Sequence, residues 1–170
     1  LLALLLTLLF QFAVQASLHA AESESDEEKK PGPYEGLKWR NIGPAFMSGR
    51  IADIDWDPTD NSVWYVGVGS GGVWKTINAG VTWTPVFDKQ TAYSIGNVTV
   101  DPSNPHRIWV GTGEDVGGRL VGFGDGIYRS DDAGKTWVKK GLEESQHIST
   151  ILVHPNDSNT VWVAVQGPLW

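Results

Sequence analysis

Apolar and polar residues alternate in short runs along the chain from Ile51 onward. A period of two residues is typical of strands with one buried face, and it does not fit a helix. Turn-forming pairs such as Asp57-Pro58 end these runs, because proline cannot donate to a strand ladder and aspartate accepts the amides of a turn. The first four strands are expected at residues 51–56, 63–68, 73–77 and 82–86.

The alternating pattern occurs three times. The segment "IADIDWDPTDNSVWYVG" from Ile51 aligns with "IGNVTVDPSNPHRIWVG" from Ile95 and "ISTILVHPNDSNTVWVA" from Ile148, with starts 44 and 53 residues apart. Four-stranded antiparallel units of this length, rich in glycine and tryptophan, are typical of β-propeller blades. We therefore expect an all-β fold, an incomplete β-propeller with about two and a half blades. The blades are expected at about 50–88, 94–142 and 147–170, the last one incomplete.

A second repeated segment locates an insertion. "GVWKTINAGVTW" from Gly72 and "GIYRSDDAGKTW" from Gly126 lie 54 residues apart, so the second unit has ten additional residues between positions 111 and 126. These residues include several glycines and acids. A long glycine-rich loop on a repeat unit is a common place for a binding site.

Turn chemistry explains the acids of the second repeated segment. "SDDAGKTW" and "TINAGVTW" resemble Asp-box repeats, with Asn78 in the place of Asp132. Either side chain can accept turn amides, a glycine supplies a positive φ, and the tryptophan buries its ring. A catalytic carboxylate would not tolerate the amide, so a structural role is expected. The residues of these two turns are Thr76, Asn78, Gly80, Trp83, Ser130, Asp132, Gly134 and Trp137.

The first 36 residues have a different character. Residues 1–20 contain an uncharged leucine-rich run followed by small residues, which predicts a signal peptide lacking its basic start, with an uncleaved membrane anchor as the alternative. Residues 21–36 form an acidic linker with prolines, and residues 37–170 the partial propeller. We therefore expect an exported protein, periplasmic or extracellular, with no stable membrane span after cleavage.

Charge and cysteine content narrow the function classes. The net charge is −7, of which the linker contributes −3, so the folded part offers no basic stripe for nucleic acid or anionic lipid. The chain has no cysteine, so the exported fold holds without disulfides.

Trp39 lies twelve residues before Ile51, as Trp83 does before Ile95, which suggests a strand that closes a final blade. The remaining blades of the same chain are therefore expected partners.

Strand order predicts where a ligand would bind. With strands running up and down, the Asp-box turns share one face, and the links 43–50, 67–72, 87–94 and 113–126 share the opposite face. This second face is the candidate ligand surface. Its candidate residues are the acids Glu114, Asp115 and Asp125, which are weak catalytic candidates, and Arg50, Ser70, Arg119 and Phe123. An arginine here could clamp a carboxylate bidentately or form a surface ion pair.

The sequence does not predict metal binding, cofactor binding or a serine nucleophile. The four histidines have no metal-ligand spacing, and the acids do not follow the calcium-loop pattern, so neither a metal nor a cofactor is expected. No serine lies in a Gly-x-Ser-x-Gly setting.

From Trp39 onward the chain resembles exported proteins with a sortilin N-terminal-like or Asp-box propeller, on the residues "WRNIGP", "SGGVWKTINAGVTW" and "GDGIYRSDDAGKTW". Photosystem II assembly factors and xyloglucanase-type glycoside hydrolases are related propellers. The xyloglucanase resemblance implies an acid in the first unit's loop, where this chain has Gly69 in "YVGVGSGG".

Two functions remain open. The first is a non-catalytic propeller domain of a larger exported protein that binds an unidentified protein, peptide or glycan. The alternative is a secreted carbohydrate-active glycoside hydrolase with an acid or base among Glu114, Asp115 and Asp125.

Overall fold

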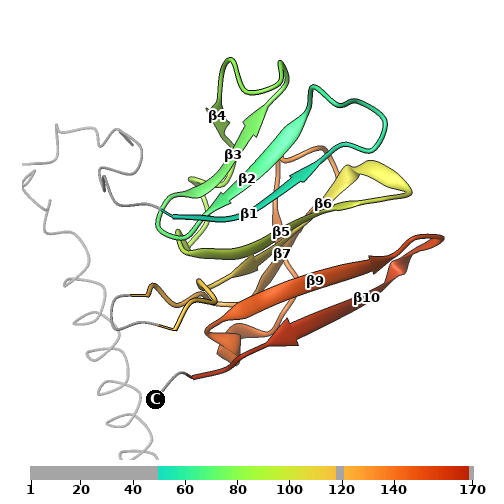
Figure 1. Cartoon of the computed structure of the whole chain (residues 1–170). Helices are drawn as coiled ribbons and strands as arrows, with labels where there is room; N and C mark the ends of the chain where they lie inside the picture. Colours follow the sequence, from blue (N-terminus) through green and yellow to red (C-terminus); the bar gives the residue numbers. More distant parts are fainter. Residues whose placement is uncertain (1–49, 118–120, 169–170) are drawn as a thin grey trace, which may run out of the picture. The chain divides into compact units, whose positions relative to one another are not determined.

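A computed structural model describes residues 50–117 and 121–168, and these residues form three antiparallel sheets (Figure 1). The first sheet has the order β1 (Ile51–Trp56), β2 (Trp64–Val68), β3 (Gly72–Thr76) and β4 (Thr84–Pro85). The second has the order β5 (Ile95–Asp101), β6 (Asn104–Thr112), β7 (Ile127–Ser130) and β8 (Val138–Lys139). The third pairs β9 (Ile148–His154) with β10 (Asp157–Val165), after a 3-10 turn, η1 (Glu143–Ser145).

The predicted all-β fold is confirmed, and its sheets are those of an incomplete β-propeller. The strands expected in the first unit lie where the alternation places them, with one difference. The fourth strand was expected at 82–86, yet β4 pairs with β3 only at Thr84 and Pro85. The reason is local: the Thr82 amide bonds to the Asn78 side chain, so it is not free for the ladder, and Pro85 has no amide hydrogen to donate.

The turn after each first strand is held by a residue at the end of the strand or directly after it. Asp57 accepts the amide of Thr59 at 2.7 Å, and Asp101 accepts that of Ser103 at 2.9 Å. In the third sheet the Nδ1 atom of His154 accepts the amide of Asn156 at 3.1 Å. The expected Asx-type turn is therefore confirmed, and a histidine ring performs the same task in the third unit.

The first strands of the three sheets lie beside one another (Figure 1), and side chains join them. In β1, Asp53 accepts the amide of Val98 at 3.1 Å and Asp55 that of Val100 at 2.7 Å. In β5, Asn97 accepts the amide of Ile151 at 3.0 Å. Side chains of the first two sheets thus accept hydrogen bonds from amides on the first strand of the following sheet. These amides lie on a sheet edge and would otherwise be unpaired.

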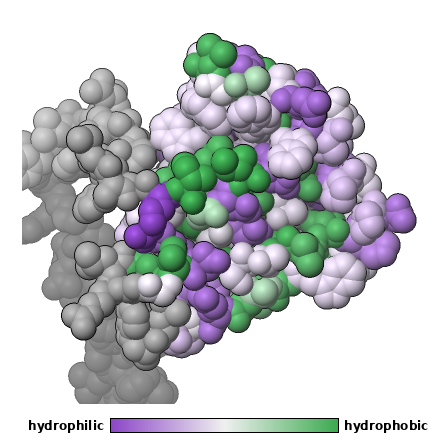
Figure 2. All heavy atoms as spheres, in the orientation of Figure 1, coloured by the Kyte–Doolittle hydropathy of each residue, from purple (hydrophilic) through white to green (hydrophobic). Residues whose placement is uncertain are grey.

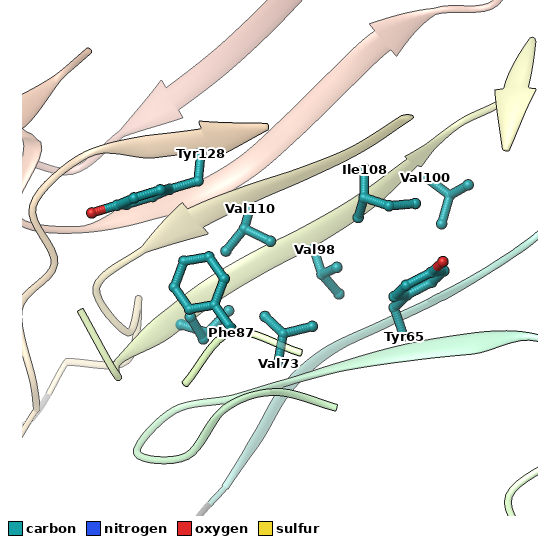
Figure 3. Packing of buried hydrophobic residues seen from close by; sticks show 9 residues of the cluster. Tyr65, Val73, Phe87, Val98, Val100, Ile108, Val110 and Tyr128 are labelled. Atoms are coloured by element: carbon teal, nitrogen blue, oxygen red, sulfur yellow. The ribbon is translucent and has the colours of Figure 1, made fainter. Parts of the chain in front are cut away.

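The main core lies between the first and second sheets (Figure 3). Tyr65 and Val73 from the first sheet face apolar residues of the second, and Phe87 from the connecting link completes the layer. Phe87 meets both Tyr128 and Trp137 edge to face, with ring centroids 5.1 Å apart in each pair. Such contacts add to the burial of apolar area that stabilises the fold. The other members of this core are Ile95, Val98, Val100, Ile108 and Val110.

Equivalent positions in the first two units differ in exposure. Ile54 and Trp56 of β1 are 49% and 55% exposed, whereas their counterparts Val98 and Val100 are 1% and 5% exposed. Apolar side chains accordingly reach the surface of the described part in separate patches between polar ones (Figure 2). In the second sheet these β5 positions pack against the first sheet, whereas the same positions of β1 in the first sheet are exposed.

Residues 1–49 lie outside the described part, and with them the expected signal peptide, linker and Trp39 strand. Among the described residues, no helix has the length and apolar character needed to span a membrane.

Candidate functional site

Backbone hydrogen bonds bring the links between strands and between sheets together at one end of the sheets. The Gly69 amide bonds to the Arg50 carbonyl, and the Gly113 amide bonds to the Ser94 carbonyl, both at 2.8 Å. The Gly72 amide bonds to the Tyr93 carbonyl at 2.8 Å. We call this surface, formed by Arg50 and residues 67–72, 87–94 and 113–126 as far as they are described, the link face.

Glu114 and Arg50 form a bidentate ion pair on the link face. Arg50 Nε donates to Oε1 of Glu114 at 2.5 Å, and Nη2 donates to Oε2 at 2.7 Å. The Glu114 side chain is 0% exposed, whereas that of Arg50 is 56% exposed. Hydrogen bonding and charge attraction from Glu114 raise the pKa of Arg50. The buried Glu114 carboxylate is therefore paired with the guanidinium of Arg50, which is partly exposed to solvent.

The backbone of Glu114 is held by Ser94 of its own unit and by His147 of the third unit. Its amide donates to Ser94 Oγ at 3.1 Å, and its carbonyl lies 2.7 Å from Nδ1 of His147. Arg50, Ser94 and His147 each stand directly before the first strand of a unit. Three equivalent positions therefore converge on one acid.

The glycine at position 69 leaves room for this acid. A Cβ atom at Gly69 would lie 2.7 Å from Cδ of Glu114 and in steric conflict with its Oε1 atom. Side-chain carbons do not approach this closely in folded proteins. Glu114 therefore occupies the space that a side chain at position 69 would take.

Asp125 is tied down by a second polar cluster. Its carboxylate accepts bonds from Thr91 Oγ1 at 2.5 Å, from Tyr128 OH at 2.9 Å and from Lys139 Nζ at 3.0 Å. Burial alone would raise the pKa of Asp125, but these donors outweigh it and lower the pKa below its usual value. An acid held ionised in this way is poorly suited to protonate a leaving group.

The other link-face candidates are less constrained. Within the described part, the side chain of Asp115 forms no hydrogen bond or ion pair, and only its carbonyl accepts one, from Gln166 at 3.3 Å. Phe123 is 72% exposed, and Ser70 is half-buried beside Gly69. Arg119 lies outside the described residues. Among the three candidate acids, Asp115 is thus the one whose carboxylate has no partner within residues 50–117 and 121–168.

Sequence reasoning did not select Tyr93, which is 63% exposed on the link face. A Cβ atom at Gly122, next to Phe123 in the chain, would lie 3.5 Å from Tyr93 OH. Exposed aromatic rings of this kind are stacking surfaces for apolar faces of ligands. Sequence reasoning also missed the roles of Ser94 and His147, although both occupy the position of Arg50 in their units.

The turns at residues 76–83 and 130–137, which follow β3 and β7, lie at the opposite end of the sheets. Asp132 accepts the amide of Thr136 at 2.8 Å, its hydroxyl at 2.6 Å and the hydroxyl of Ser130 at 2.7 Å. These bonds lower the pKa of Asp132 to about 2. Asn78 accepts the Thr82 amide and the Thr76 hydroxyl in the same way, both at 2.9 Å.

A pair of residues in each of these turns has a positive φ, Ala79 and Gly80 at 53° and 90°, and Ala133 and Gly134 at 59° and 87°. The glycines were expected to adopt this conformation and the alanines were not. The Ala133 carbonyl accepts bonds from Tyr65 OH at 3.2 Å and Lys75 Nζ at 3.0 Å. The second turn is therefore fastened to the first sheet.

The described residues contain no group of three histidine, aspartate or glutamate side chains that lie close enough together to bind a metal ion.

Comparison with known proteins points to one class of enzyme. No family model matches the chain. The oligoxyloglucan-reducing end-specific xyloglucanase of Emericella nidulans is 29% identical over 139 residues, which cover 79% of this chain and 16% of that enzyme. Xyloglucanase Xgh74A of Acetivibrio thermocellus is 28% identical over 112 residues, which cover 63% of this chain and 13% of that enzyme. The chain spans about one-sixth or less of the length of these curated relatives.

Solved structures agree on the fold. A GH74 enzyme from Niastella koreensis matches with a TM-score of 0.53 at 26% identity, over 66% of this chain and 16% of that one. An ancestral GH74 enzyme matches with a TM-score of 0.54 at 17% identity, over 67% of this chain and 16% of that one. The described sheets thus resemble a small part of much longer xyloglucanase-like propellers.

Proposed function

We propose that this chain is part of a secreted glycoside hydrolase that acts on xyloglucan or a closely related β-glucan. The observation that carries the proposal is the 29% identity to a xyloglucanase over 139 residues, most of the propeller region. The comparisons thus favour the alternative drawn from the sequence over a non-catalytic interaction domain. The expected export of the protein agrees with an extracellular polysaccharide as substrate.

The described residues would supply part of the substrate-binding surface and at most one catalytic acid. A glycosidase needs two carboxyl groups about 5 to 10 Å apart. Glu114 and Asp125 are both engaged by cations, whereas Asp115 has an uncommitted carboxylate within the described part. Asp115 is therefore our candidate acid or base, and the second carboxyl group would come from outside the described residues.

The link face has the features of a sugar-binding surface. It combines the exposed rings of Tyr93 and Phe123 with polar groups and glycine-rich backbone. Sugars present apolar ring faces and many hydroxyl groups, which fit aromatic rings and fixed hydrogen-bond donors. The Asp-box end offers fewer such groups, because the polar side chains of its turns bond to their own backbone.

Hydrolysis of xyloglucan by the complete protein tests this proposal. Release of reducing ends would be measured for the wild type, for Asp115→Asn and for Asp60→Asn, which alters an exposed acid in the turn between β1 and β2, outside the link face. We expect kcat to fall by about 100-fold or more in Asp115→Asn and to stay within about twofold in Asp60→Asn. Absence of hydrolysis by the folded wild type on xyloglucan and other β-glucans would refute the hydrolase proposal.

A further inference from the structure

A buried carboxylate beneath an exposed guanidinium is the most constrained polar arrangement on the link face. Glu114 is 0% exposed, so a ligand cannot reach it, whereas the Arg50 side chain is 56% exposed. A guanidinium has five N–H donors. Two N–H groups, on Nε and Nη2, point to Glu114. The other three are not used in this ion pair.

The pair is fixed in place before any ligand arrives. Ser94 and His147 hold the backbone of Glu114 at 3.1 and 2.7 Å, and the Gly69 backbone lies against its carboxylate. Arg50 in turn is tied to the first unit through its carbonyl, which accepts the Gly69 amide. A donor held in one orientation loses less entropy when it binds an acceptor.

The charge of the pair sets the kind of ligand that fits. The carboxylate of Glu114 compensates the positive charge of Arg50, so the site offers directed donors with little net charge. An anion gains little from such a pair, whereas a neutral hydroxyl group can accept its hydrogen bonds. Tyr93 stands next to Ser94 on the same surface and provides an exposed aromatic ring.

We infer that Arg50, positioned by the buried Glu114, binds the hydroxyl groups of a neutral glycan at the link face. Arg50 is the ligand-contacting residue, and Glu114 is a positioning residue that also prevents the site from selecting acidic sugars. The choice of a glycan as ligand rests on the proposed function, whereas the requirement for a neutral ligand follows from the ion pair itself.

Binding of two oligosaccharides to the complete protein, measured by calorimetry, tests the inference. The neutral probe is a xyloglucan oligosaccharide, and the acidic probe is an oligogalacturonate. For Arg50→Gln we expect the Kd of the neutral probe to rise about tenfold, since a charge-assisted donor is lost. Lys135→Gln removes an exposed positive charge in the turn at residues 130–137, away from the link face, and should leave this Kd within about twofold.

Two further variants test whether Glu114 positions Arg50 and compensates its charge. Glu114→Gln leaves Arg50 uncompensated, so the ratio of acidic to neutral affinity should rise about tenfold or more. Gly69→Ala should displace the carboxylate and weaken neutral binding in the same direction as Arg50→Gln. Gly117→Ala is the steric control, because a Cβ atom there meets no described residue within 4 Å. If Glu114→Gln does not fold, Arg50→Gln and Gly69→Ala decide the question.

The outcomes separate this inference from the proposed function. Wild-type protein that binds the neutral probe through Arg50 but does not cleave it would leave the inference standing and refute the hydrolase. Cleavage of the neutral probe by the wild type, together with an unchanged Kd for this probe in Arg50→Gln, would support the hydrolase and refute the inference. An unchanged affinity ratio in a folded Glu114→Gln variant, or no wild-type binding of the neutral probe, would overturn the inference.

Discussion

The indole of Trp137 in the second unit donates a 2.8 Å hydrogen bond to the carbonyl of Val86, which belongs to the link after the first sheet. The same ring packs on Phe87. Trp137 therefore stabilises the contact between two units as well as its own turn. Its counterpart Trp83 is 38% exposed and was expected to be buried in the same way.

Replacing Trp137 should destabilise the protein more than replacing Trp83. Trp137→Ala removes an interface ring and its hydrogen bond, and we expect a loss of about 3 kcal/mol in the free energy of unfolding. Trp83→Ala and Asp132→Ala should each cost about 1 kcal/mol. Denaturant unfolding of the three variants measures the order. Equal losses for both tryptophans would contradict the role of Trp137 between units.

Asp132 should make stability depend on pH in acid. Its pKa in the folded protein is lowered to about 2 from a usual value of 3.8, so its contribution is present above about pH 4 and lost as the pH falls toward 2. Asp132→Asn should flatten the unfolding free energy over this range while keeping the turn, as Asn78 does in the first unit. An unchanged slope between pH 4 and 2 would rule out this role.

The carboxylates of β1 should protect amides of β5. Asp55 accepts the Val100 amide at 2.7 Å, so Asp55→Ala leaves this donor without its partner. We expect a loss of about 1 to 3 kcal/mol in stability and faster hydrogen exchange at Val100. Asp55→Asn keeps an acceptor oxygen and serves as the control. Unaltered exchange at Val100 in Asp55→Ala would show that this hydrogen bond does not hold the first two sheets together.

Trp162 should become buried in the complete protein. Its counterparts Tyr65 and Trp109 are 1% and 8% exposed between sheets, whereas Trp162 is 55% exposed. We expect a further blade of the same protein to cover it. Acrylamide quenching of tryptophan fluorescence should therefore be weaker in the complete protein than in the 170-residue chain. Trp162→Phe in both proteins identifies the contribution of this ring.

The repeated alternation was sufficient to predict the sheets, because each unit forms its strands from local residues. The short β4 was not predicted, since the bond between Asn78 and the Thr82 amide withdraws a residue that fits the strand pattern. The positive φ angles of Ala79 and Ala133 were missed for a similar reason, because alanine rarely adopts them without support from its surroundings.

The sequence was sufficient to predict that the candidate residues share one face of the sheets, but it did not predict their contacts. Strand order placed Arg50 and Glu114 on the same face, and a bidentate carboxylate clamp was considered for Arg50. The carboxylate proved to be Glu114 itself, 64 residues away in the sequence. Only the packing of neighbouring units brings Arg50 and His147 to Glu114, and a single sequence carries no signal of these contacts beyond the equivalent positions of Arg50, Ser94 and His147.

The most direct measurement is hydrogen exchange of the complete protein with and without a xyloglucan oligosaccharide. We predict slower exchange in residues 67–72, 87–94 and 113–126, with no change at residues 76–83 and 130–137. Protection confined to the turns at residues 76–83 and 130–137 would contradict this prediction, because the ligand would then bind at the opposite end of the sheets, where Asp132 and Asn78 stabilise the turns.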